Sequence, residues 1–337
     1  MSAGCHPMGL YLAAHFTIKV KPVKRAEALQ IAEAALHQAG FQVSQRCSVR
    51  ASCFDFAARD EERLFFAKVF GNIHDVSPGV ADGIKTISGC FSSASLFLSG
   101  INEGDPLRDD TVYSRYDVHV VTLKTFEDVV LRGRFPLVKA ARGGYSVALD
   151  GRKIRERRHE LGLSIGKLAG MVGVSRRTLY GYERGLTRAS VSTAYELGKV
   201  LGVPVAETID VFEAPPRGSK SGSSSARGSQ DVRGGFLGSI LSKLTQFGLK
   251  VLPTNRAPFD FTADCPREEF KIVGGVFRRK EPYLEERVRE ILSLSAIVRA
   301  KTLFLGEERT AVPEDVAFLN YDELAGMKDR EELTALL

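Results

Sequence analysis

At 337 residues the chain is long enough for two or three domains, each with its own hydrophobic core. Hydrophobic residues make up 44% and charged residues 26% of the sequence, which excludes a predominantly disordered or fibrous protein. The formal net charge of +6 is modest but concentrated, because residues 151–210 hold eleven Lys or Arg against six Asp or Glu, a net of +5. The basic character therefore belongs to the middle of the chain.

Several classes of site are not indicated. The five cysteines form no CxxC pair and no Cys/His cluster at zinc spacing, and the six histidines are scattered. No apolar run approaches the length of about 20 residues that a membrane helix needs, and the N-terminus lacks the charged start of a signal peptide. We therefore expect a cytoplasmic protein with no cofactor and no membrane partner. The cysteines are Cys5, Cys47, Cys53, Cys90 and Cys265.

The first part of the chain, residues 1–135, alternates strand and helix patterns. Apolar residues at helical spacing predict a helix over 24–38, and Gly40 ends it. This order of elements predicts an α/β domain with a central mixed sheet. The other predicted elements are strands at 41–45, 53–59 and 63–70, a helix at 80–91, strands at 95–100 and 118–123, and a helix at 124–133.

The last part, residues 236–337, repeats this plan. Phe-Asp-Phe occurs at 54–56 and again at 259–261, "SLFLSG" matches "TLFLG", and "VHVVTLKTFEDV" matches "VAFLNYDELAGM". Three matched landmarks in one order predict a duplicated α/β domain. Between the copies, residues 136–151 predict a β-hairpin around Gly143-Gly144, and the Gly/Ser/Arg-rich residues 214–235 predict a flexible linker.

Residues 152–213 predict an all-α domain. A first helix spans 152–161, and a second begins after the N-cap Ser164 with apolar residues at helical spacing. Gly173 makes a tight turn, and a third helix follows the N-cap Ser175, with Leu179 and Tyr182 facing the core. A fourth helix, 190–201, closes the bundle.

The stretch "LSIGKLAGMVGVSRRTLYGYERG" resembles the helix-turn-helix domains of the Cro and phage-repressor class, in which helix three lies in the major groove. The whole order of domains resembles a family of archaeal transcriptional regulators. The resemblance implies double-stranded DNA as the partner, a recognition helix from Ser175 to Arg184, and a homodimer. The DNA-contacting residues that it implies are Ser164, Lys167, Ser175, Arg176, Arg177, Thr178, Tyr180, Gly181 and Arg184.

The chain departs from that class at Ile165 and Gly166, where polar residues often brace the recognition helix, and Lys167 is a candidate replacement. Arg176 and Arg177 are open to three interpretations. They could donate to guanine O6 and N7, they could bind phosphate without reading sequence, or they could form a solvated basic face. Glu183 is interpreted as a residue that holds the bundle together.

The Phe-Asp-Phe segments raise a second hypothesis. Metal-dependent nucleases of the restriction-endonuclease type place an aspartate on one strand and Glu-x-Lys on the next, so that carboxylates converge on a cation. The first copy has Asp55 and Lys68, but Phe66 stands at the acidic position. The second copy offers Asp260, Glu269 and Lys271.

The sequence therefore favours a sequence-specific DNA-binding regulator that is not an enzyme. The flanking restriction-endonuclease-like domains would serve dimerisation, further DNA contact or effector sensing, and a contact with the transcription machinery is possible. The alternatives are a metal-dependent nuclease that uses Asp260, Glu269 and Lys271, and an RNA-binding protein that uses the linker.

Overall fold

The computed structural model describes residues 23–213, 236–265, 269–277, 281–309 and 311–337. The chain divides into two compact units, each built from separated stretches of sequence. The first unit comprises residues 1–35, 70–75 and 97–211, and the second comprises 36–69, 76–96 and 212–337. The linker predicted at 214–235 lies outside the described residues.

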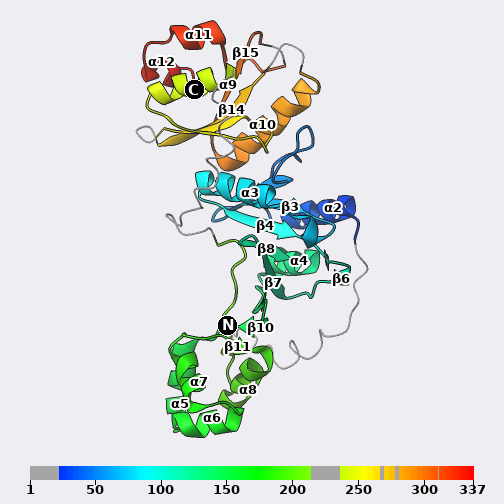
Figure 1. Cartoon of the computed structure of the whole chain (residues 1–337), viewed down its shortest axis with the longest axis vertical. Coiled ribbons are helices and arrows are strands. Elements are labelled where there is room, and N and C mark those ends of the chain that lie inside the picture. Colours follow the sequence, from blue (N-terminus) through cyan, green and yellow to red (C-terminus); the bar gives the residue numbers. More distant parts are fainter. Residues whose placement is uncertain (1–22, 214–235, 266–268, 278–280, 310) are drawn as a thin grey trace. The chain divides into compact units, whose positions relative to one another are not determined.

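The part before residue 136 has the predicted α/β character (Figure 1). Its helices are α2 (Arg25–Gln38), α3 (Pro78–Phe91) and α4 (Leu123–Arg132), with a 3-10 turn η1 (Ile73–Asp75). Its strands are β1 (Gln42–Val43), β2 (Phe56–Arg59), β3 (Leu64–Val69), β4 (Ala94–Leu98), β5 (Ile101–Asn102), β6 (Asp105–Pro106), β7 (Thr111–Arg115) and β8 (Val118–Val121). Neighbouring strands β1, β2 and β3 pair antiparallel, as do β7 and β8.

Local sequence explains where these helices begin and end. The Ser77 side chain accepts a hydrogen bond from the Val80 N–H, and Pro78 occupies the first helical position of α3, two residues before the predicted start. Thr122 caps α4 in the same way, and Gly133 ends it at φ 63°.

The hairpin between the α/β and helical parts forms as predicted. Strands β9 (Val138–Ala141) and β10 (Gly144–Val147) pair antiparallel, with Gly144 at φ 113° in the turn. Strand β9 also pairs parallel with β7, and β10 pairs with β11 (Ala189–Ser190) from the helical domain. The hairpin is therefore continuous with the helical domain within the first unit.

The C-terminal part forms a mixed five-stranded sheet in the order β12-β13-β14-β15-β16. Pairs β12-β13 and β13-β14 are antiparallel, whereas β14-β15 and β15-β16 are parallel. The strands are β12 (Lys250–Pro253), β13 (Phe261–Cys265), β14 (Phe270–Val276), β15 (Lys301–Gly306) and β16 (Ala317–Asn320). The helices are α9 (Phe236–Gln246), α10 (Leu284–Val298), α11 (Tyr321–Gly326) and α12 (Arg330–Thr334), of which the last was not expected from the sequence.

The two faces of this sheet are covered by different helices. Apolar residues of α9, α11 and α12, among them Leu244, Leu324 and Leu333, share one buried cluster with the sheet residues Phe261 and Leu303. Helix α10 lies on the opposite face, against β14 and β15, and it also contacts β2 (Figure 1). One helix therefore packs on strands from both halves of the second unit.

Candidate nucleic-acid interface

The helical domain consists of α5 (Gly151–Glu160), α6 (Ile165–Val172), α7 (Arg176–Glu183) and α8 (Val191–Leu201). Each of the four begins at an N-cap whose side chain accepts a backbone N–H three residues on. These caps fix where each helix starts, and so fix which side chains face outward. They are Asp150, Ser164, Ser175 and Ser190.

The core of this domain follows the predicted helical spacing. Leu168, Ala169, Leu179 and Tyr182 are buried as expected, with Leu179 fully inaccessible. The hairpin residue Val147 belongs to the same cluster. The domain is therefore a packed bundle that includes part of the hairpin, and its helices are rigidly placed relative to one another.

The turn between α6 and α7 has the predicted geometry. Gly173 adopts φ 78°, a conformation that side chains disfavour, and its N–H bonds to the Ala169 carbonyl. The Ser175 Oγ accepts the Thr178 N–H at 3.0 Å and lies 2.8 Å from Thr178 Oγ1. Both hydroxyls are thus engaged in starting α7.

The outward face of α7 is basic and aromatic. Arg176, Arg177, Tyr180 and Arg184 are exposed, and Thr178 is half-buried. The Arg184 Nε donates to the Tyr180 hydroxyl at 3.2 Å, and the guanidinium carbon lies 5.4 Å from the ring centroid. One turn of the helix therefore presents a linked arginine and tyrosine beside two further arginines.

Gly181 was expected on the outward face, and this prediction is wrong. Gly181 is buried, because the loop after α7 folds over it, and a Cβ there would lie 3.2 Å from Thr187 Oγ1. Helical spacing alone does not reveal a loop that returns over a helix. Gly181 therefore packs against the loop and does not offer a surface for contact.

The first turn of α6 carries the predicted Ser164 and Lys167, both exposed. Ser164 Oγ accepts the Lys167 N–H at 3.1 Å. Between them, Gly166 lies directly beneath the Arg176 side chain: a Cβ on Gly166 would stand 2.8 Å from Arg176 Nε and 3.1 Å from its guanidinium carbon. The absence of a side chain at residue 166 is what allows this contact.

A buried ion pair joins the first and third helices of the bundle. The Arg158 Nε donates to Glu183 Oε1 at 2.6 Å and its Nη2 to Oε2 at 3.0 Å, while Nη1 donates to the Leu163 carbonyl. The two side chains are only 6% and 5% exposed. The hydrogen bond with Glu183 raises the pKa of Arg158. The interpretation of Glu183 as a residue that holds the bundle is confirmed.

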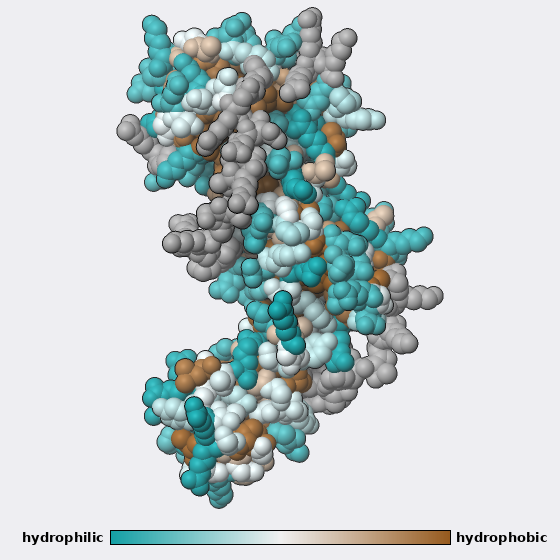
Figure 2. All heavy atoms as spheres, in the orientation of Figure 1, coloured by the Kyte–Doolittle hydropathy of each residue, from teal (hydrophilic) through white to brown (hydrophobic). Residues whose placement is uncertain are grey.

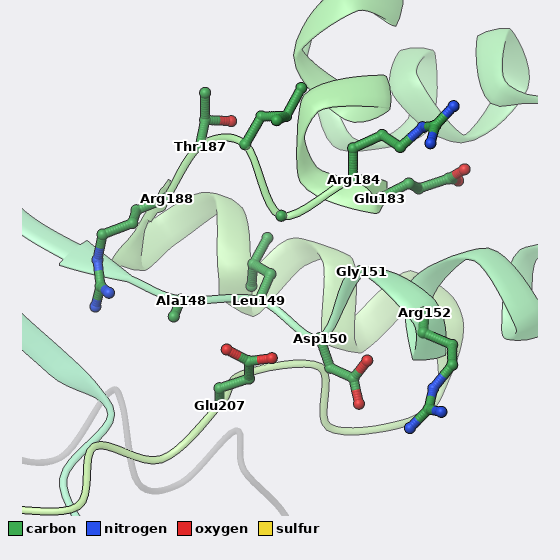
Figure 3. Close-up of a pocket in the computed structure, with 12 residues that line it drawn as sticks. Ala148, Leu149, Asp150, Gly151, Arg152, Glu183, Arg184, Thr187, Arg188 and Glu207 are labelled. Carbon is green, nitrogen blue, oxygen red and sulfur yellow. The ribbon is translucent and has the colours of Figure 1, made fainter. Parts of the chain in front are cut away.

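A cavity of about 440 Å³ lies beside the C-terminal end of α7 (Figure 3). The loop after α7, with Thr187 and Arg188, runs opposite the segment from Ala148 to Arg152. The charged residues that line the cavity are Arg152, Arg184 and Arg188 together with Asp150, Glu183 and Glu207. Because the charges of the two signs are equal in number, this cavity does not select for phosphate.

The nuclease constellation in the second copy is not assembled. Asp260 accepts the Val276 N–H on its Oδ2 at 2.6 Å, so it lies at one end of the β13-β14 ladder. Lys271 lies toward the other end, where it pairs in register with Asp264, and its Nζ is 3.7 Å from Asp264 Oδ1. Glu269 is exposed in the turn at φ 57°. The hypothesis that Asp260, Glu269 and Lys271 share one site is therefore wrong.

The first copy shows which residues do correspond. Asp55 Oδ2 accepts the Val69 N–H at 2.8 Å, just as Asp260 accepts that of Val276. Val69 and Val276 therefore occupy equivalent positions on the two strands. Three residues before them lie Phe66 and Val273, and one residue before them lie Lys68 and Gly275. The second copy thus lacks both the acidic residue and the lysine of the nuclease motif.

In the first copy the lysine is present but the acid is not. Lys68 Nζ lies 3.2 Å from Asp55 Oδ1 and donates to the Ser52 carbonyl at 2.7 Å. Phe66 is fully buried, with its ring centroid 4.9 Å from that of Phe54. Within the described ranges, no three His, Cys, Asp or Glu side chains lie together in a way that could hold a metal ion.

Two arginines occupy the space around Asp260. Arg287 is fully buried and donates from Nη2 to Asp260 Oδ2 at 2.5 Å and from Nη1 to both oxygens of Glu281 at 2.8 Å. Arg50, from the first copy, donates to Asp260 Oδ1 and to Glu281 Oε1, each at 2.8 Å. Burial lowers the pKa of Arg287, and the Asp260 carboxylate opposes that effect. Both Asp260 oxygens are thus bound by guanidinium groups.

Other contacts join the two halves of the second unit. The buried Glu290 of α10 accepts the N–H groups of Ser48 and Val49 on Oε1, at 2.6 and 3.1 Å. The Arg256 carbonyl accepts the Cys53 N–H at 2.8 Å. Loops from both copies therefore exchange hydrogen bonds across this packing.

Two family models match the chain. The model described as "PD-(D/E)XK superfamily domain" matches residues 25–136, and the model described as "Helix-turn-helix" matches residues 154–207. Fold and sequence together define a protein that joins a helix-turn-helix domain to nuclease-type α/β structure. Among the described residues, no helix is both long enough and apolar enough to cross a membrane.

Archaeal relatives match nearly the whole chain. A protein of Archaeoglobus fulgidus named "Putative HTH-type transcriptional regulatory protein" is 30% identical over 303 residues, which cover 90% of this chain and 94% of the relative. A protein of the same name from Methanothermobacter thermautotrophicus is 33% identical over 85% of this chain and 86% of its own length. The chain belongs to this family of helix-turn-helix regulatory proteins. The resemblance read from the sequence is confirmed.

A solved structure described as "SINR PROTEIN/SINI PROTEIN COMPLEX" is 24% identical to the chain. The aligned region covers 25% of this chain and 77% of the solved chain, with a TM-score of 0.16.

Several residues of these sites were not singled out in the sequence. Arg158, Arg50, Arg287 and Glu290 all act through partners far along the chain or on another helix, and Gly166 was noted only as a departure from the helix-turn-helix class. A signal was present for one of them: Arg287 precedes Val288 and shares the helical face of Ile291 and Leu294, which are buried.

Proposed function

We propose that this protein is a transcriptional regulator that binds double-stranded DNA through α7 in the major groove. The observation that carries the proposal is the outward face of α7, where Arg176 and Arg177 project from a capped helix that is packed on a buried core. Arginine can donate two hydrogen bonds to the O6 and N7 atoms of guanine. The net charge of +5 in residues 151–210 adds attraction for phosphate.

The working unit is proposed to be a homodimer. One recognition helix of eight residues reads only a few base pairs, and two-fold symmetric operators are read by two such helices about one helical turn of DNA apart. The remaining DNA-facing candidates are Ser164, Lys167, Ser175, Thr178, Tyr180 and Arg184. Ser164 and Ser175 would contribute mainly by starting their helices, because their hydroxyls already serve as caps.

We propose that the α/β parts are not catalytic and serve as a scaffold for dimerisation, further DNA contact or effector sensing. A nuclease of this superfamily needs acidic oxygens that are free to bind a cation. Here both oxygens of Asp260 face arginines, Asp55 is paired with Lys68, and phenylalanine replaces the acid at residue 66. A contact with the transcription machinery would be a further role of the same scaffold.

The proposal is tested by selection from a random pool of 30-base-pair duplexes with the purified full chain. We expect the wild type to enrich a recurrent, two-fold symmetric motif, and the double variant Arg176→Ala/Arg177→Ala to enrich none. Lys199→Ala, which removes one exposed positive charge from α8, serves as the control and should retain the motif. A wild-type pool without any recurrent motif, or a double variant with the wild-type motif, contradicts the assignment of α7.

The match to the PD-(D/E)XK model supports a nuclease as the second candidate. It is tested by incubating the protein with supercoiled, branched and single-stranded DNA in the presence of magnesium or manganese. We expect no cleavage above that of an Asp55→Ala/Asp260→Ala variant prepared in parallel. Cleavage by the wild type that this variant lacks would establish the nuclease.

A further inference from the structure

Two adjacent arginines begin the recognition helix, but the structure gives their side chains different surroundings. The Arg176 guanidinium lies on the backbone of Gly166 in the first turn of α6, within 3.1 Å of where a Cβ would stand. Arg177 is exposed, and in the described part of the chain its side chain has neither an ion pair nor a hydrogen bond. Neighbouring residues on a helix point about 100° apart, so the two side chains leave α7 in different directions.

The position of Arg176 decides what it can reach. In helix-turn-helix domains the helix before the recognition helix crosses the sugar-phosphate backbone, and the recognition helix enters the groove. An arginine whose guanidinium rests on α6 can therefore reach the phosphates that this helix crosses. The planar guanidinium can donate two parallel hydrogen bonds to phosphate oxygens.

We propose that Arg176 binds phosphate in a position set by Gly166, and that Arg177 is the residue that determines base preference. This division rests on the proposed binding of DNA by α7. A side chain at residue 166 would displace the guanidinium from α6. The glycine therefore takes the place of the polar brace that the Cro and phage-repressor class carries near this point.

The first test compares two glycines of the same helix. Gly166→Ala and Gly170→Ala each add one methyl group to α6 and raise its helix propensity, but only the first meets Arg176, since nothing lies within 4 Å of a Cβ on Gly170. We expect Gly166→Ala to weaken binding on the order of tenfold for all duplexes alike, whereas Gly170→Ala binds as the wild type does. Both variants should fold, because the obstructing atom is the end of a flexible side chain. Equal binding by the two variants would overturn the role of Gly166.

The second test separates the arginines. Arg176→Ala should leave the selected motif unchanged. The logarithm of its DNA association constant falls as the logarithm of the salt concentration rises, and the steepness of that fall should decrease by about one. Arg177→Ala should flatten the preference at one or two positions of the motif while it changes the salt slope less. The variant Gly166→Ala/Arg176→Ala should bind like Arg176→Ala alone, since the glycine acts through the arginine.

The outcomes separate this division of roles from the proposed function. If Arg176→Ala changes the base preference and keeps the salt slope, or if the two substitutions add in the double variant, Arg176 is not a phosphate contact set by Gly166. The binding of DNA by α7 would still stand in that case. If neither single arginine variant changes binding to any duplex, the assignment of α7 fails, and the division of roles fails with it.

Discussion

At the scale of single residues, the most consequential contact of the helical domain is the pair between Arg158 and Glu183. Both side chains are almost completely buried, and Arg158 donates two hydrogen bonds to the Glu183 carboxyl group. Removing one partner of a buried pair leaves an uncompensated charge in a medium that solvates it poorly. Removing one partner is therefore expected to lower the stability of the domain by more than the intact pair contributes to it.

We expect Glu183→Ala to destabilise the helical domain by about 3 to 5 kcal/mol, because Arg158 would stay buried without a carboxylate. The measurement is hydrogen exchange of peptides from residues 151–201 in the full chain, which reports local opening. Glu160→Ala is the matched control: its partner Arg157 is exposed to 36% and Glu160 to 61%, so exchange should hardly change. Equal protection in the two variants would show that the buried pair does not stabilise the bundle.

The sequence predicted the outward arginines of α7 well because the N-cap serine fixes the phase of the helix. It failed for Gly181, which a neighbouring loop covers. It also failed for Glu269 and Lys271, because the strand register depends on the length of the turn. The residue that bonds to the aspartate follows it by 14 positions in the first copy and by 16 in the second. A spacing taken from one copy therefore selects the wrong residues in the other.

At the scale of elements, α7 is held at its C-terminal end by the start of α5. A Cβ on Gly151 would lie 2.5 Å from the carbonyl oxygens of both Tyr182 and Glu183. These are backbone atoms, which cannot move aside as a flexible side chain can. The close approach of α5 to α7 thus depends on glycine at this one position.

Gly151→Ala should therefore push α5 away from α7 and destabilise the domain by about 1 to 3 kcal/mol, the usual cost of overpacking. Hydrogen exchange of α5 and α7 should accelerate, and DNA binding should fall because the recognition helix is displaced. Gly170→Ala, in open space on α6, controls for the added methyl group and should not accelerate exchange. Unchanged exchange in Gly151→Ala would mean that the two helices adjust without cost.

The type and order of most longer elements were predictable, because periodicity, caps and glycine stops are local signals. Strand β7, the two-residue strands β5 and β6, and the short helix α12 were missed. The pairing of β10 with β11 was not predictable, since β11 has only two residues and no periodicity. Nor was the contact of α10 with β2, which joins segments more than two hundred residues apart. Contacts between distant segments leave little trace in a single sequence.

At the scale of the whole molecule, the second unit is assembled from two segments of the first hundred residues and from the C-terminal third of the chain. Residues 36–69 and 76–96 lie in one unit with 212–337. The halves are joined by the Arg50 pairs with Asp260 and Glu281, by the bonds from Ser48 and Val49 to Glu290, and by α10 on β2. These contacts combine apolar packing with partly buried charge-assisted bonds, which salt screens less than it screens exposed pairs.

The two halves should accordingly remain together when the covalent connection between them is cut. A protease site inserted between residues 213 and 236 would be cleaved in the purified protein, which is then passed over a size-exclusion column in 0.5 M salt. We expect both fragments in one peak, as seen on a denaturing gel of its fractions. In the variant Arg50→Ala/Glu290→Ala the fragments should separate at lower urea than in the wild type, because the loop 48–50 loses its partners in the other half. Wild-type fragments that elute apart at micromolar concentration would show that the second unit is held together by the chain and not by its packing.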